Sequence, residues 1–174
     1  MRDEQGRIVG VRLRALHGGK KWSISGSRSG LFLSRVHRPE GRHLFVVEGA
    51  TDLAAALDLG LPSIGRSNCR SGFHQIHGYL QRLGTAKVTV VADNDGPGRG
   101  GAIALANDLA KRSIAASVIV PPSGNDLRDS ICGGIKAEDL FEAVPIFTAA
   151  AQSRPVQLTM DFAGADITPP TAAR

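Results

Sequence analysis

The chain has 174 residues, 42% of them hydrophobic, with 21 Lys/Arg, 16 Asp/Glu and two cysteines. This length suggests one domain; no apolar run could span a bilayer, and two cysteines are too few for a disulfide scaffold or a four-cysteine zinc site. The start, MRDEQGR, lacks a signal-peptide apolar region, so we expect a cytoplasmic protein with no membrane partner.

The basic excess lies in the first quarter of the chain. Residues 1–43 hold ten Lys/Arg and three acids, whereas residues 44–150 hold nine and eleven. Alternating stretches such as RIVGVRLRAL and KKWSIS predict β-hairpins, and Arg12 and Arg14 would share one strand face. A basic β-rich segment over 1–43 favours nucleic acid as a partner; an ordinary solvated surface is the alternative.

Residues 44–145 alternate between strand and helix patterns. The predicted strands are LFVV (44–47), LPSIG (61–65), KVTVVAD (87–93) and SVIVP (117–121). The predicted helices are TDLAAALDLG (51–60), FHQIHGYLQRLG (73–84), GGAIALANDLAKRS (100–113) and a short one near 137–143. This alternation predicts an α/β fold with a parallel sheet covered on both faces. Residues 146–174, rich in Ala, Pro and Thr, lack a long periodic pattern, and we expect them to be disordered.

Acidic residues follow three of these strands. Glu48 comes directly after LFVV, Asp93 and Asp95 come at the end of KVTVVAD, and the loop after SVIVP holds Asp126 and Asp129. Because ligands bind beyond the carboxyl ends of parallel strands, these acids are expected at one edge. Gathered carboxylates repel one another, and a divalent cation removes that penalty. We therefore predict Mg²⁺, for which Mn²⁺ could substitute, held by Glu48, Asp93 and Asp95 against substrate phosphates.

The stretch DNDGPGRGGA admits other interpretations. Its glycines match the dinucleotide-binding pattern G-x-G-x-x-G, but Asp93 and Asp95 would face a pyrophosphate without a metal, and the expected ribose-binding acid is missing. An EF-hand loop starting at Asp93 fails because Pro97 and Ala104 occupy ligand positions. A plain Asx turn with no function is the structural alternative.

Two motifs in this region resemble a known family. VVEGATDLAAAL followed by VVADNDGPGRGGA resembles the Toprim domain of topoisomerases and bacterial-type primases, over roughly residues 44–130. The likeness is strongest to primases of phages, plasmids and mobile elements, where a basic β-rich segment precedes the Toprim core. The resemblance implies a Rossmann-like core over 44–145, a role in DNA replication, and a DNA template and nucleotides as partners, with a replicative helicase as a further candidate.

The first two motifs carry the family's roles onto four acids. Glu48 matches the glutamate thought to act as general acid/base in nucleotidyl transfer, and Asp52 matches the acid that closes the first motif. Asp93 and Asp95 match the family's Mg²⁺ ligands.

The third acidic motif departs from the family. GNDLRD keeps the first acid as Asp126, has Arg128 in place of the second, and retains an acid one position later as Asp129. The Cys/His zinc module of a complete primase and the P-loop of a fused helicase are also absent from this sequence.

Several further residues are candidates for binding. The candidate nucleic-acid or phosphate ligands are Arg12, Arg14, Lys20, Lys21, Arg66, Arg70 and Arg99, with ordinary surface charge as the alternative. Trp22 could stack a base, but we favour an anchor for the small β-layer. Cys69, His74 and His77 could form a metal trio, but no fourth ligand is evident, and we favour histidines on a helix surface.

The tail contains a short peptide motif. Gln157, Met160 and Phe162 lie in QLTMDF, which resembles the Q-x-x-[L/M]-x-F peptide that docks bacterial replication proteins on the sliding clamp. An extended tail with a glutamine and two apolar side chains suits binding in a groove. Such short motifs also recur by chance.

Three functions are therefore open. The leading hypothesis is a primase-like nucleotidyltransferase that synthesises primers on a DNA template. A Toprim nuclease would use the same acids to activate water against a phosphodiester. A non-catalytic accessory protein would use them only to clamp phosphate.

Overall fold

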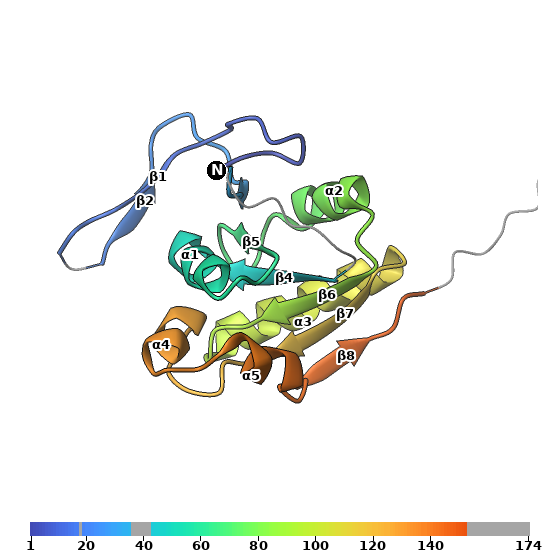
Figure 1. Cartoon of the computed structure of the whole chain (residues 1–174). Helices are drawn as coiled ribbons and strands as arrows, with labels where there is room; N and C mark the ends of the chain where they lie inside the picture. The colour runs from blue at the N-terminus through green and yellow to red at the C-terminus, as the bar shows by residue number, and fades with distance from the viewer. Residues whose placement is uncertain (18, 36–42, 153–174) are drawn as a thin grey trace, which may run out of the picture.

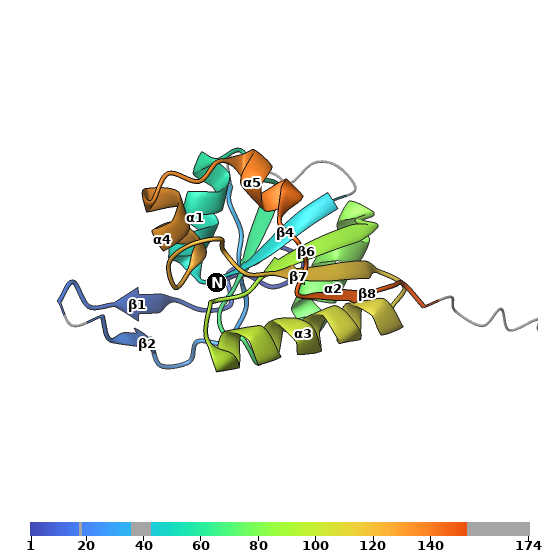
Figure 2. The same ribbon diagram turned by 90° about the horizontal axis from the view of Figure 1, so that it is seen from below.

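The fold is built on one twisted sheet with helices on both faces (Figures 1 and 2). A computed structural model describes residues 1–17, 19–35 and 43–152. In these residues the main sheet has six strands in the order β3-β5-β4-β6-β7-β8. They are β3 (Leu31–Phe32), β4 (His43–Glu48), β5 (Ser63–Arg66), β6 (Lys87–Val91), β7 (Ala115–Ile119) and β8 (Phe147–Ala149). The four central strands are parallel, and the two edge strands, β3 and β8, run antiparallel to their neighbours.

Five helices connect or follow these strands in the described part of the chain. They are α1 (Ala50–Asp58), α2 (Phe73–Leu83), α3 (Gly96–Lys111), α4 (Leu127–Cys132) and α5 (Ala137–Glu142). Among the described residues, no helix has the length and apolar character needed to cross a membrane. The observed α/β sandwich with a mostly parallel sheet confirms the predicted fold class.

Strand alternation divides the core into two layers. In β4, Leu44 and Val46 pack with α2 and α3, whereas Phe45 and Val47 pack with α1, α4 and α5. Figure 2 shows these two helix groups on opposite sides of the sheet. Because both strand faces are buried, β4 and β6 read as continuous apolar runs in the sequence. The sheet is therefore packed on both faces, and its carboxyl edge positions the side chains that follow the strands.

A separate two-stranded ribbon extends beyond that edge. β1 (Arg12–Arg14) and β2 (Lys21–Ser23) pair antiparallel, with Leu13 opposite Trp22. Both views place this hairpin on the side where β4 and β6 end (Figures 1 and 2). The basic segment contains β1, β2 and β3, of which β3 joins the main sheet.

Two stretches differ from the sequence predictions. The composition predicts disorder from residue 146, but Phe147–Ala149 form β8, because pairing with β7 satisfies their backbone groups and Ala149 is buried against the core. The helix expected from residue 100 begins at Gly96 instead, since Asp95 caps it there and Pro97 suits the first turn. The proposed clamp-binding residues Gln157, Met160 and Phe162 lie outside the described residues.

Candidate active site at the carboxyl ends of the strands

The predicted acids come from three neighbouring parts of the sheet edge. Glu48 is the last residue of β4, and Asp93 follows β6 by two residues. Asp95 caps α3, its Oδ1 accepting a hydrogen bond of 2.6 Å from the Gly98 amide. Asp126 caps α4 in the same way, its Oδ1 accepting from the Asp129 amide at 2.8 Å. Helix capping therefore fixes one oxygen of each cap residue.

The loops that carry these acids are tied to each other. Asn94 donates its backbone N–H to the Asn125 carbonyl at 2.7 Å and its side-chain amide to the Gly124 carbonyl at 3.3 Å. These bonds join the loop after β6 to the loop after β7. They explain how Asp93 and Asp126, far apart in sequence, come within electrostatic reach.

Asp93 is at the centre of this acidic cluster. Its pKa is raised to about 6, first by burial and then by the charges of Glu48, Asp126 and Asp95, while Arg66 opposes the rise. These carboxylates come from the end of β4, the loop after β6 and the loop after β7. The structure therefore brings together Glu48, Asp93, Asp95 and Asp126.

Asp52 joins the same acidic cluster from helix α1. It lies in the first turn of α1 and is only 3% exposed. Burial raises the pKa of Asp52 to about 7, with contributions from Asp126 and Asp93, against a stabilising hydrogen bond from the backbone of Arg128. Buried carboxyls perturbed by both desolvation and like charge are characteristic of functional sites.

Arg66 has a different place from the one predicted. The sequence makes it a candidate phosphate ligand on the surface, but it is the largest fully buried side chain, at 0% exposure. Its Nη1 donates to the carbonyls of Cys69 at 3.0 Å and Gly101 at 3.2 Å, and its Nη2 lies 3.5 Å from Glu48 Oε2. Because solvent does not reach this guanidinium, its role in the structure is to hold Glu48 and the start of α3.

Two glycines of the glycine-rich stretch allow close packing. A Cβ at position 98 would lie 2.8 Å from the Asp93 carbonyl oxygen and 2.9 Å from Asp95 Oδ1. A Cβ at Gly101 would lie 2.3 Å from the Cys69 carbonyl oxygen. The stretch therefore serves to fold the aspartate loop onto α3 and to seat α3 against the loop after β5.

The basic hairpin and the acidic edge share a cavity of about 200 Å³. Arg12, Arg14 and Lys21 line it from the hairpin, and Glu48 lines it from β4. A polyanion in this cavity would have the cations of the hairpin on one side and the Glu48 carboxylate on the other.

Thr51 and Asn68 also line this cavity, and sequence reasoning did not single them out. Asn68 follows the carboxyl end of β5, so the rule that ligands bind beyond parallel strands could have identified it. Thr51 lies between Glu48 and Asp52, within the motif that carries both acids.

The donor set fits a divalent cation that shares its ligands with a substrate. Glu48 Oε2 and Asp52 Oδ1 are buried without a hydrogen bond, and the raised pKa of Asp93 reflects repulsion that a cation would relieve. In the described residues, no group of three or more His, Cys, Asp or Glu side chains is arranged to hold a metal ion. Mg²⁺ accepts one or two carboxylates together with phosphate oxygens and water, so the unpaired oxygens of Glu48 and Asp52 would suit it only in a site that a substrate completes.

Unlike the buried Arg66, the other predicted basic residues are exposed. Arg99 is exposed and its guanidinium donates to the Asn94 side chain. Arg70 is exposed and lines a second cavity, beside Gly96 and Pro97. Lys20 is exposed at the hairpin. Asp129 pairs with Arg128 at 3.4 Å and is not among the charges that raise the pKa of Asp93.

Trp22, the two histidines and Cys69 lie in three different parts of the fold. Trp22 is 43% exposed on the hairpin. His74 is exposed on α2, but His77 is buried, so the expectation of a surface position was wrong for His77, which faces the core. Cys69 is a free thiol in the loop after β5.

Comparison with known proteins gives a likeness in structure. No protein-family model matches this chain, and no curated protein matches it in sequence. Among solved structures, the DnaG primase catalytic domain bound to ssDNA is similar, with a TM-score of 0.64 and 21% identity over 83% of this chain and 52% of that one.

Two further primases are similar. The Aquifex aeolicus primase, comprising zinc-binding and RNA polymerase domains, matches with a TM-score of 0.66 and 20% identity over 84% of this chain and 40% of that one. The RNA polymerase domain of Mycobacterium tuberculosis primase DnaG, in complex with double-stranded DNA, matches with a TM-score of 0.54 and 25% identity over 74% and 46%. The fold thus matches part of a primase catalytic core, and this chain spans about half the length of these structures or less.

Proposed function

We propose that this chain is a primase-like nucleotidyltransferase of the Toprim type, which synthesises primers on a DNA template. The observation that carries the proposal is the acidic cluster around Asp93, one member of which, Glu48, lines a cavity together with the basic hairpin. The primase fold of the similar structures supports it, and two of those structures contain DNA.

The basic residues of the hairpin and the acids of the cluster have different roles in this proposal. Arg12, Arg14 and Lys21 hold the phosphates of the DNA strand above the sheet edge. Asp93 and Asp95 would hold Mg²⁺, or Mn²⁺ in its place, which when bound neutralises charge on the triphosphate. Arg66 fixes the Glu48 carboxylate, and Glu48 assists proton transfer from the reacting hydroxyl.

Primer synthesis by purified protein tests this function. With Mg²⁺ or Mn²⁺, single-stranded DNA and nucleotides, the wild type should synthesise primers, and Glu48→Gln or Asp93→Asn should lower the rate by about 100-fold or more. Asp58→Asn, an exposed acid at the far end of α1, is the matched control. Equal product from Glu48→Gln and wild type would refute the proposal. Strand cleavage without nucleotides would instead indicate a nuclease.

One observation favours a second function, a non-catalytic nucleic-acid-binding role. No group of three metal-ligating side chains is arranged for an ion in the described residues, and Glu48 already has a cationic partner in Arg66. Under this function, DNA affinity would persist while neither synthesis nor cleavage was detected in the same assay. The proposed helicase and sliding-clamp partners stay predictions under either function.

A further inference from the structure

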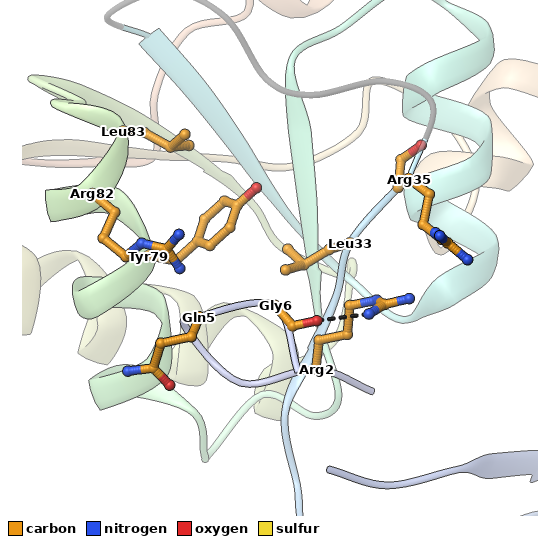
Figure 3. Close-up of a pocket in the computed structure, with 9 residues that line it drawn as sticks. Arg2, Gln5, Gly6, Leu33, Arg35, Tyr79, Arg82 and Leu83 are labelled. Atoms are coloured by element: carbon orange, nitrogen blue, oxygen red, sulfur yellow. Dashed lines mark hydrogen bonds between the residues drawn. The ribbon is translucent and has the colours of Figure 1, made fainter. Parts of the chain in front are cut away.

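A second basic cavity lies away from the acidic cluster. It measures about 420 Å³ and is lined by Arg2, Arg35 and Arg82 together with Tyr79 and Leu33. α2 forms one wall, and the first turn of the chain and the segment after β3 form the others (Figure 3). Its volume exceeds what a single inorganic phosphate needs and is typical of small-molecule sites.

The α2 wall of this cavity lies near the amino end of β6. Arg82 is near the end of α2, which leads into the first residue of β6, whereas Asp93 follows the last residue of that strand. A five-residue strand spans roughly 16 Å at about 3.3 Å per residue. The cavity shares no lining residue with the cavity beside Glu48, so it is a different site from the proposed active site.

Backbone carbonyls fix two of its three arginines. Arg2 Nη1 donates to the Gly6 carbonyl at 2.6 Å, and Arg82 Nη1 donates to the Glu4 carbonyl. A guanidinium has five N–H donors, so each keeps several for a ligand. Because these bonds order both side chains before binding, an anion would meet preorganised donors.

Carboxylates do not neutralise these arginines in the described part of the chain. No ion pair there involves Arg2, Arg35 or Arg82. Of the acids in the adjoining turn, Asp3 pairs with Arg7 at 2.8 Å, and the Glu4 carboxylate accepts a hydrogen bond from the Gln5 side chain at 2.9 Å. Three cations that share one cavity repel each other, and a bound anion would relieve that repulsion.

The remaining wall is aromatic and apolar. Figure 3 shows Tyr79 pointing from α2 toward Leu33, with Arg2 and Arg35 on the other side of Leu33. Leu83 extends this wall. A flat ring beside arginines suits a ligand that carries both a planar base and phosphate, because bases stack on aromatic rings and guanidinium groups bind phosphate oxygens.

We propose that this cavity is a second nucleotide-binding site, which takes the phosphate and base of a nucleotide, either free or within a single strand. It goes beyond the proposed catalytic function and stands without it. Binding is measured in EDTA on an Asp93→Asn background, so that occupancy of the acidic cluster by metal and nucleotide does not contribute.

The test compares two charge reversals with the same change in net charge. Arg35→Glu alters the cavity at an exposed residue, and Lys111→Glu alters the exposed end of α3, outside the cavity. A labelled thymidine oligonucleotide is titrated by fluorescence anisotropy, and ATP is titrated by calorimetry. We expect Arg35→Glu to lower the affinity for at least one of the two ligands by about five-fold or more relative to Lys111→Glu.

The two titrations identify the source of the nucleotide. If Arg35→Glu lowers the affinity for the oligonucleotide and makes that affinity less dependent on salt, the cavity binds a strand. If it lowers the affinity for ATP, the cavity binds a free nucleotide. A loss below about five-fold for both ligands, relative to Lys111→Glu, overturns the proposal. Arg82→Met is the second variant, with thermal unfolding to verify its fold because Arg82 also holds Glu4, and the same threshold applies to it.

Discussion

At the scale of single residues, Asp52 gives the clearest consequence of burial. Its carboxyl is 3% exposed, and its pKa rises from 3.8 to about 7. The folded state therefore binds a proton more tightly than the unfolded state does. The stability linked to this group is complete below about pH 4, falls as the pH rises toward 7 and is constant above that. Between these two limits, the contribution of Asp52 to the free energy of unfolding changes by on the order of 4 kcal/mol at most.

Asp52→Asn should remove this dependence. An amide cannot ionise, so the variant should be more stable than wild type at about pH 8, by on the order of 1–3 kcal/mol, and closer to it at about pH 5. Urea denaturation in EDTA at the two pH values measures this. Asp58→Asn, exposed on the same helix, should keep the wild-type pH dependence. Identical pH dependence in Asp52→Asn and wild type would contradict the assignment.

At the scale of elements, the docking of α3 decides whether the acids meet. The helix begins at the aspartate loop and packs its Gly101 against the Cys69 carbonyl, where Arg66 Nη1 joins both backbone segments. A shift of α3 would move Asp95, its cap, and change the contact between Arg66 and Glu48. Helix position and acid geometry are thus coupled through Arg66.

Two neighbouring glycines of α3 should respond in opposite ways to the same substitution. Gly101→Ala would place a Cβ 2.3 Å from a backbone oxygen and should destabilise the protein by about 1–3 kcal/mol. Gly100→Ala meets nothing within 4 Å and should stabilise it by about 0.5–1 kcal/mol, because alanine favours the helix. Urea midpoints at constant m-value measure both. Equal stability of the two variants would show that α3 does not pack as described.

The elements differ in how far the sequence alone could identify them. β4 and β6 are buried on both faces, so their apolar runs are unambiguous, and the acids beyond them follow from the rule for parallel sheets. α4 has only six residues, in a stretch rich in Ser, Gly and Asp that resembles a loop. β8 has three residues and exists because β7 offers an unpaired edge, which no local pattern reveals.

The burial of Arg66 could not be predicted from the sequence either, because it also depends on tertiary contacts. An arginine at the end of a short strand, followed by Ser and Asn, has the local character of a surface residue. Its burial depends on two carbonyls and one carboxylate contributed by the loop after β5, α3 and β4. Such partners assemble only in the folded chain, so the pairing with Glu48 is a tertiary property.

At the scale of the whole molecule, charge is separated along the sheet axis. The carboxylates gather where the parallel strands end, and the cationic hairpin extends beyond them (Figure 1). Arg12, Arg14 and Lys21 lie on this hairpin and line the cavity that Glu48 shares, so their field attracts polyanions toward the acidic edge. Across the β1–β2 ribbon, Arg14 lies opposite Lys21, and both line the cavity that Glu48 shares.

This arrangement predicts how salt should affect DNA binding. Neutralising a phosphate releases counterions, so the joint variant Arg14→Ala/Lys21→Ala should lower the slope of log affinity against log salt by about 1 for each phosphate that it leaves without a cation. Both side chains are exposed, so unfolding free energy should change by less than about 0.5 kcal/mol for each. Anisotropy titrations over a range of salt concentrations give the slope, with Lys111→Ala on α3 as control. If the joint variant keeps the wild-type slope, the strand does not cross the hairpin, and the cations beside Glu48 must serve another ligand.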